Sequence, residues 1–147
     1  MKSETMKLLV EAKAQNESFA RAVVGAFASR INPNLEQLSD IQTAVSEAVT
    51  NCIVHGYNGK VGNIEITATI EGKSITIEIT DHGWGISDVD KARQAFYTTC
   101  ADMERSGMGF TIMEAFMDEV KVSSTPGIGT TVSMTKEIVA KDDECVA

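Results

Sequence analysis

The sequence predicts an α+β fold, a two-layer sandwich in which helices cover one face of a mostly antiparallel sheet. Two stretches repeat apolar residues every three or four positions, which is the period of an amphipathic helix. Four later stretches alternate β-branched and polar residues, and a turn signal separates the members of each pair. Helices and hairpins in this order pack naturally as two layers. At 147 residues, the chain is expected to form a single domain, residues 1–147.

Two helices are expected in the first third of the chain. The first covers residues 16–31, where the apolar residues recur at helical spacing: Phe19, Ala20, Val23, Val24 and Phe27. The second follows Asn34, which can cap its first turn, with Gln37 as the reciprocal partner three residues later. This second helix is expected to run to about His55 and to stop at Gly56.

Two β-hairpins are expected in the remainder. Their strands are residues 63–70 with 73–80, and residues 118–125 with 129–137. Glu71–Gly72 separates the first pair, and Pro126–Gly129 provides the turn of the second. The predicted order is therefore two helices, a hairpin, a helix and a second hairpin.

The segment between the two hairpins has weaker signals. Residues 88–96 are weakly helical in pattern, and an apolar run predicts a short helix that begins near Gly107. After the second hairpin, the polar residues 140–147 are expected to form a disordered tail.

Composition argues against several classes of protein. The formal net charge is 13 − 21 = −8 and no Lys/Arg cluster is present, so nucleic acid is not expected as a direct partner. The three cysteines, Cys52, Cys100 and Cys145, form no CxxC pair, which fits a reduced environment. No apolar stretch has the length of a signal peptide or a membrane span. These observations predict a cytoplasmic protein without a membrane partner.

Glu47 and Asn51 form the first candidate site, on the second predicted helix. At 100° per residue they lie about 40° apart, roughly opposite the apolar stripe. A carboxylate and a carboxamide one turn apart can serve as a base and as an oxygen ligand for Mg²⁺. A solvated helix face is the alternative interpretation.

Asp81 begins the second candidate site, directly after a predicted strand. Its carboxylate can accept a hydrogen bond from the amino group of a base. Gly83 and Gly85 follow, and glycines let a ligand lie against bare backbone. A simple turn is the alternative, because glycine pairs are common in turns.

Two further glycine-containing segments are candidates. Gly107 and Gly109 open a predicted helix, where free N–H groups and the helix dipole favour a phosphate, with Arg105 nearby. The alternative is an ordinary junction between a loop and a helix, and neither GxxxxGK nor GxGxxG is present. Residues 127–131 place a threonine hydroxyl at the start of a strand. The alternative interpretation of this segment is a simple hairpin turn.

In this order the four segments resemble the motifs of the Bergerat nucleotide-binding fold shared by gyrase, Hsp90, histidine kinases and MutL. SEAVTNCIVHGY resembles its N box, DHGWGI its first glycine box, ERSGMGFTIME its second and GIGTT its closing element. Within that group the chain is similar to the small anti-sigma factor kinases of spore-forming bacteria, to which QNESFAR adds a further match. The chain departs from their pattern at His82, at Trp84 and at Cys100–Ala101.

The resemblance implies an ATP-dependent protein serine kinase. It assigns Asn51 to the Mg²⁺ that bridges the ATP phosphates, and Glu47 to the proton of a substrate serine. Asp81 would read the adenine amino group, and Arg105 would act beside the transferred phosphate. The residues assigned to the rest of the ATP or ADP site are Gly83, Gly85, Thr98, Thr99, Gly107, Gly109 and Thr130. The first two glycines line the adenine pocket, the two adjacent threonines form a lid, the last two glycines cradle phosphate, and Thr130 supports Asp81.

The resemblance also implies two protein partners and a homodimer. One partner is an RNA polymerase sigma factor, the sporulation factor sigma F, which is held inactive. The other is an anti-anti-sigma protein, which is phosphorylated on serine. Arg21, Glu104 and Arg105 would contact them. Two alternatives remain: an ATP-gated sigma-binding module without kinase activity, and the related kinase of the general stress response.

Overall fold

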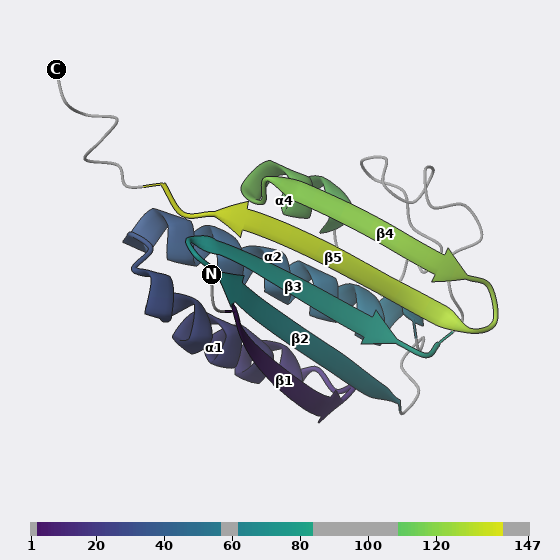
Figure 1. Ribbon diagram of the computed structural model, residues 1–147. Coiled ribbons are helices and arrows are strands. Elements are labelled where there is room, and N and C mark those ends of the chain that lie inside the picture. Colours follow the sequence, from purple (N-terminus) through teal and green to yellow (C-terminus); the bar gives the residue numbers. More distant parts are fainter. Residues whose placement is uncertain (1–2, 57–61, 84–108, 140–147) are drawn as a thin grey trace, which may run out of the picture.

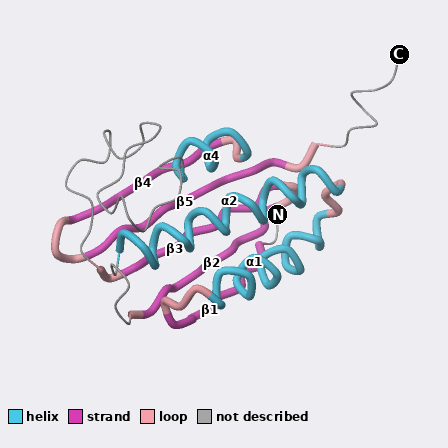
Figure 2. Tube along the Cα trace, turned by 180° about the vertical axis from the view of Figure 1, so that it is seen from behind, coloured by secondary structure: helices cyan, strands magenta, loops and turns pink. Residues whose placement is uncertain are grey.

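The computed structural model describes residues 3–56, 62–83 and 109–139, which form two layers (Figure 1). One layer is an antiparallel sheet with strand order β1-β2-β3-β5-β4. The other consists of helices on a single face of that sheet, which stand in front in Figure 2. The elements are β1 (Ser3–Glu11), α1 (Gln15–Ala28), α2 (Leu35–Asn51), β2 (Asn63–Glu71), β3 (Ser74–Asp81), α4 (Gly109–Phe116), β4 (Glu119–Thr125) and β5 (Gly129–Glu137). The predicted α+β sandwich is confirmed.

The helices begin and end close to their predicted limits. A 3-10 turn, Ser29–Ile31, continues α1 to the predicted end. The capping box of α2 is present, because the Asn34 side chain accepts from the Gln37 N–H and the Gln37 side chain accepts from the Asn34 N–H. At its other end, α2 continues as a π-helical turn, Cys52–Gly56, and so reaches the predicted stop.

The strand β1 was missed by the predicted element order, which began with helices. Met6, Leu8 and Val10 alternate along it and face the core, so a period of two is present. Leu9 interrupts the pattern, because this leucine points to the open face and is 62% exposed. β1 pairs with β2 along its whole length and forms one edge of the sheet.

The core lies between the sheet and the helices. Successive rungs across the sheet bring apolar side chains together, such as Ala68, Ile77 and Met134 on β2, β3 and β5. On the helical side α2 lies between α1 and α4 and packs against both. Its buried stripe, Ile41, Ala44, Val45, Ala48 and Val49, covers the middle of the sheet.

The opposite face of the sheet is polar. Threonine hydroxyls pair across neighbouring strands on this face: Thr5 with Thr69, Thr76 with Thr135, and Thr80 with Thr131. No described helix covers it, as the view in Figure 1 shows. A sheet with one apolar and one hydroxylated face accounts for two layers rather than three.

Two predicted features lie outside the described residues: the helical segment 88–96 and the tail 140–147. The predicted start of the short helix near Gly107 also falls outside them, and α4 is described from Gly109 onward. None of the helices in the described part has the length and apolar character that a bilayer span requires.

Candidate functional site

The candidate site lies where the inner face of the sheet changes from apolar to polar. Rungs of isoleucine, valine and methionine precede it, but the last rung joins Ile64 to Asp81 and Asp81 to Thr130, with Ser124 beyond. Asp81 is 4% exposed and Thr130 is 7% exposed, and these are the buried polar side chains of the described residues. A buried carboxylate requires hydrogen-bond donors, so its surroundings define the site.

The Asp81 carboxylate accepts a hydrogen bond from its own turn. The Gly83 N–H donates to Oδ1 at 3.0 Å. The Cys52 side chain, at the end of α2, and the Thr130 backbone, on β5, are close enough to the carboxylate to act on its pKa.

Burial raises the pKa of the Asp81 carboxyl above its ordinary value. The hydrogen bonds from Gly83, Cys52 and Thr130 act in the opposite direction, as does the neighbouring charge of His82. Burial also raises the pKa of the Cys52 thiol well above its usual range, and the negative charge of Asp81 adds to this effect. Cys52 is therefore a thiol and not a thiolate nucleophile.

Gly129 allows β5 to approach Asp81 closely. Its φ is +146°, and a Cβ at this position would lie 2.1 Å from the Asp81 carbonyl oxygen. The hydroxyl of the next residue, Thr130, is hydrogen-bonded to the Ser124 hydroxyl at 2.7 Å. The Ser124 hydroxyl also donates to the Gly129 carbonyl at 3.1 Å. Thr130 therefore meets Asp81 through its N–H, while its hydroxyl is directed to β4.

Asn51 and Gly109 meet where α2 and α4 pack together. A Cβ on Gly109 would lie 2.9 Å from Nδ2 and 3.0 Å from Oδ1 of Asn51. Glu47 lies one turn earlier on α2. Both Glu47 and Asn51 are half-buried.

The donor set fits a magnesium ion that is held mainly by a bound phosphate. Among the described residues, no group of three or more His, Cys, Asp or Glu side chains could hold a metal. Asn51 offers one amide oxygen beside the backbone that begins α4. One or two protein oxygens are enough for Mg²⁺, which keeps several waters and takes phosphate oxygens as ligands.

The remaining predicted residues are divided between α1 and segments outside the described ranges. Arg21 lies on α1, with its side chain 45% exposed and 4.0 Å from the Glu17 carboxylate. Glu17 also accepts a 2.5 Å hydrogen bond from Ser46, the residue before Glu47. Predicted residues that lie outside the described ranges are Gly85, Thr98, Thr99, Glu104, Arg105 and Gly107.

Sequence reasoning missed two residues of the site. Cys52 was considered as one of three cysteines that form no CxxC pair, although its position next to Asn51 places it at the same end of α2. Ser124 was counted only as a strand residue, although the hairpin register pairs it with Thr130. The position of Ser124 opposite Thr130 could have been predicted from the hairpin pattern, because the turn Pro126–Gly129 fixes which residues face each other.

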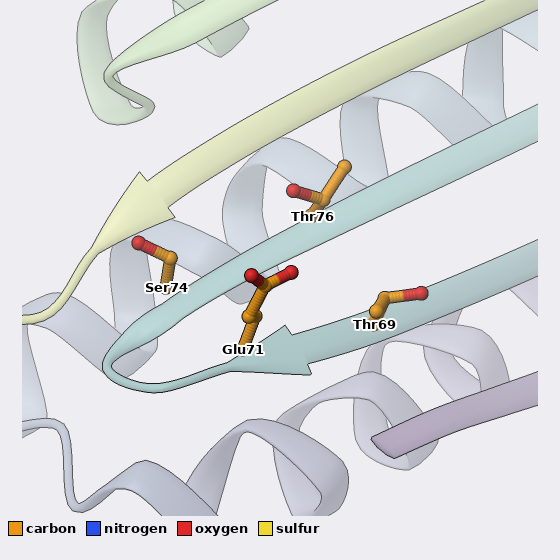
Figure 3. A pocket seen from close by; sticks show the side chains of 4 residues that line it. All are labelled: Thr69, Glu71, Ser74 and Thr76. Carbon is orange, nitrogen blue, oxygen red and sulfur yellow. The ribbon is translucent and has the colours of Figure 1, made fainter. Parts of the chain in front are cut away.

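A shallow depression elsewhere on the sheet has a different character. It is lined by Thr69, Glu71, Ser74 and Thr76 on the open face, beside the turn between β2 and β3 (Figure 3). That turn is at the opposite end of the hairpin from Asp81. Because it lies at that opposite end, the depression does not belong to the candidate site.

Comparison with known proteins places this arrangement in a family. Residues 10–136 match the family model described as "Histidine kinase-like ATPase domain". The RsbU and RsbW domains of Rv1364c from Mycobacterium tuberculosis share the fold, with a TM-score of 0.66 and 22% identity over 92% of this chain. The chain spans 32% of that structure's length. The chain thus belongs to the histidine kinase-like ATPase domain family.

Curated relatives narrow the class. The anti-sigma F factor of Thermoanaerobacter sp. strain X514 is 59% identical over 90% of this chain and 93% of its own length. That of Clostridium acetobutylicum is 50% identical over 97% of this chain and 100% of its own length. The anti-sigma F factor of Bacillus licheniformis is 49% identical over 94% of both. The chain belongs to the anti-sigma F factor family.

Proposed function

We propose that this chain is an ATP-dependent serine protein kinase that also binds and inhibits the sporulation factor sigma F. The observation that carries the proposal is the convergence of Asp81, Asn51 and Gly109 at one end of the molecule. They come from the three segments that resemble the first glycine box, the N box and the second glycine box. Family membership supports the proposal, because the curated relatives carry the name anti-sigma F factor.

The adenine base is recognised by Asp81 in this proposal. The carboxylate is buried and accepts a hydrogen bond from the Gly83 N–H, and its further lone pairs can accept from an amino group. Gly83, and Gly85 outside the described residues, line the same pocket. Gly129 lets the start of β5 approach the backbone of Asp81 closely.

The phosphates lie at the junction of α2 and α4. Asn51 holds Mg²⁺, and the backbone at Gly109, with Gly107 before it, cradles phosphate at the start of α4. Arg105 neutralises charge beside them, and Thr98 and Thr99 cover them. Phosphoryl transfer needs mainly positioning and neutralisation, which this set supplies.

Glu47 acts as the base in the transfer step. It accepts the proton of the substrate serine hydroxyl while the serine oxygen bonds to the γ-phosphorus. The bond from that phosphorus to the bridging oxygen breaks, and ADP leaves with the electron pair. The half-buried position of Glu47, one turn from Asn51, suits this role.

The proposed partners are sigma F, the anti-anti-sigma protein that carries the phosphorylated serine, and a second copy of this chain. Arg21 is exposed on α1 and is offered as a contact, together with Glu104 and Arg105 outside the described residues. A net charge of −8 favours encounter with a basic partner. The Glu17 carboxylate connects Arg21 to the helix that carries Glu47.

Transfer of labelled γ-phosphate from Mg·ATP to the anti-anti-sigma protein tests the proposal. Wild type is expected to label a serine. Glu47→Gln should bind ATP without transfer, and Asn51→Ala should lose binding of Mg·ATP. Glu78→Gln, on the open face of the sheet, is the matched control and should retain both activities.

Three results would contradict parts of the proposal. Retained transfer in Glu47→Gln would remove the role of that carboxylate. ATP and sigma F binding without labelled product in wild type would leave a gated inhibitor that is not a kinase. Recovery of a general-stress sigma factor in place of sigma F would change the partner.

A further inference from the structure

We propose that Ser124 is a positioning residue that fixes the Thr130 hydroxyl as a hydrogen-bond acceptor toward the base of the nucleotide. This inference rests on the proposed function, because it takes the rung of Asp81 and Thr130 to contact the base. It adds a residue outside the four motif segments and gives a physical reason for selectivity between purines.

The three polar side chains lie in one rung across the end of the sheet. Asp81 on β3 pairs with Thr130 on β5, which in turn pairs with Ser124 on the edge strand β4. Asp81 and Thr130 are buried, and Ser124 is half-buried. Directly opposed residues on one face of a sheet have Cβ atoms about 4.5–5.5 Å apart. Neighbouring side chains of this rung are therefore within reach of each other.

Ser124 makes two hydrogen bonds to β5. Its hydroxyl donates to the Gly129 carbonyl at 3.1 Å and lies 2.7 Å from the Thr130 hydroxyl. A carbonyl oxygen can only accept, so the bond to Gly129 uses the single proton of the Ser124 hydroxyl. The bond between the two hydroxyls is then donated by Thr130.

The direction of that bond decides what Thr130 offers to a ligand. A hydroxyl has one proton and two lone pairs. With its proton directed to Ser124, Thr130 has only lone pairs for any other neighbour. The ionised Asp81 carboxylate beside it also offers only lone pairs. Buried acceptors are favourable only when a donor meets them, so this rung is suited to a ligand group that donates.

The chemical consequence is selectivity at C6 of the purine. Adenine carries an amino group there, which donates. Hypoxanthine carries a carbonyl at the same position, which would meet Asp81 and Thr130 as one acceptor against two others. Without the Ser124 hydroxyl, the Thr130 hydroxyl can rotate and donate to that carbonyl. Removal of the serine hydroxyl should therefore weaken the discrimination.

Titration calorimetry with the full chain compares the binding of ATP, ITP and purine riboside triphosphate, each with Mg²⁺. ITP carries a carbonyl at C6, and purine riboside triphosphate carries only hydrogen there. The variants are Ser124→Ala, which removes the hydroxyl, and Ser124→Thr, which keeps it. Ser123→Ala is the matched control, because Ser123 is the preceding serine of β4, is exposed and pairs with Thr131 on the open face.

Wild type is expected to prefer ATP, and Ser124→Ala to reduce the ratio of ATP to ITP affinity by about fivefold, the contribution of one hydrogen bond. Ser124→Thr and Ser123→Ala should keep the wild-type ratio. Binding of purine riboside triphosphate should be the same in wild type and Ser124→Ala, because its C6 hydrogen neither donates nor accepts. If Ser124→Ala does not fold, Ser124→Cys should lower the ratio in the same direction, since a thiol is a weaker donor and acceptor.

A double-mutant cycle tests whether Ser124 acts through Thr130. Thr130→Val removes the hydroxyl and should lower the ratio at least as much as Ser124→Ala. Adding Ser124→Ala to Thr130→Val should then change the ratio no further. A further fall would show that Ser124 acts on the base by another route and would overturn the inference.

Equal ratios in Ser124→Thr and Ser124→Ala would also overturn the inference. Equal weakening of all three nucleotides would do the same, because it would show that Ser124 only ties β4 to β5. If wild type binds ATP and the Ser124 variants leave the ratio unchanged, only this inference fails. If wild type binds no ATP, the proposed function fails with it.

Discussion

Gly129 shows how one residue fixes the geometry of the site. Its positive φ and the approach of its Cα to the Asp81 carbonyl leave no space for a side chain. Gly127 in the same turn also has a positive φ, +81°, but its missing side chain would meet nothing within 4 Å. Substitution of Gly127 would therefore introduce backbone strain alone, whereas substitution of Gly129 would introduce both backbone strain and a steric clash.

Gly129→Ala is expected to lower the free energy of unfolding by about 3 kcal/mol, because strain and a clash with β3 add together. Gly127→Ala should cost about 1 kcal/mol, since only the strained backbone remains. Urea denaturation of both variants measures the difference. Equal losses would show that the contact with Asp81 carries no energy.

Asp81 predicts a pH dependence of stability. Burial raises its pKa in the folded state, so the folded state binds more protons than the unfolded state between the two pKa values. The slope of the unfolding free energy against pH is then negative for this group. Its contribution is fully present below the unfolded pKa, about 3.9, and is lost as pH rises through the folded pKa.

Comparison of wild type with Asp81→Asn isolates the contribution of Asp81 to the pH dependence of stability, because the other acids titrate in both proteins. The unfolding free energy of wild type minus that of the variant should fall as pH rises above about 4 and then become constant. Urea denaturation at a series of pH values measures it. A difference that grows with pH would show that the donors around Asp81 outweigh its burial.

At the scale of elements, Lys136 joins three parts of the fold. It lies on β5 with its side chain 13% exposed, and its ammonium donates to the Phe116 carbonyl at the end of α4 at 2.7 Å. The same group lies 3.9 Å from the Asp40 carboxylate on α2. A cation at the C-terminus of a helix also interacts favourably with its dipole.

Lys136→Met should reduce the free energy of unfolding by about 1–2 kcal/mol, because a half-buried carboxylate and a helix-end carbonyl lose their partner. Lys121→Met is the matched control. Lys121 also pairs with a carboxylate, at 3.3 Å, but its side chain is 73% exposed, so a change under about 0.5 kcal/mol is expected. Equal effects in a urea titration would contradict the role given to Lys136.

Helices and strands with a strong local sequence pattern could be predicted, whereas β1, whose pattern is interrupted, could not. The capping residues Asn34 and Gln37 fixed the start of α2 because the bonds that cap a helix are local. β1 was missed because the exposed Leu9 hides the alternation of its neighbours, and its pairing with β2 spans more than fifty residues. Local pattern carries no information about such a distant partner.

At the scale of the whole molecule, the ordered motifs predicted which segments form the site but not all of its contacts. Asp81 lies two residues after Ile79, so strand alternation places it on the inner face. The position of Cys52 near Asp81 and the contact between Asn51 and Gly109 depend on how α2 packs against β3 and α4. Helix packing of this kind has no local sequence signature.

The hydroxylated outer face of the sheet also constrains how this sequence can drift. Replacing a threonine there by valine would cost little within one molecule, since the two side chains have similar shapes and strand preferences. Several such changes along the paired threonines would create a flat apolar slab, which invites stacking against another sheet. Selection at those positions is therefore expected to act through solubility in a crowded cell, at a place remote from any chemistry.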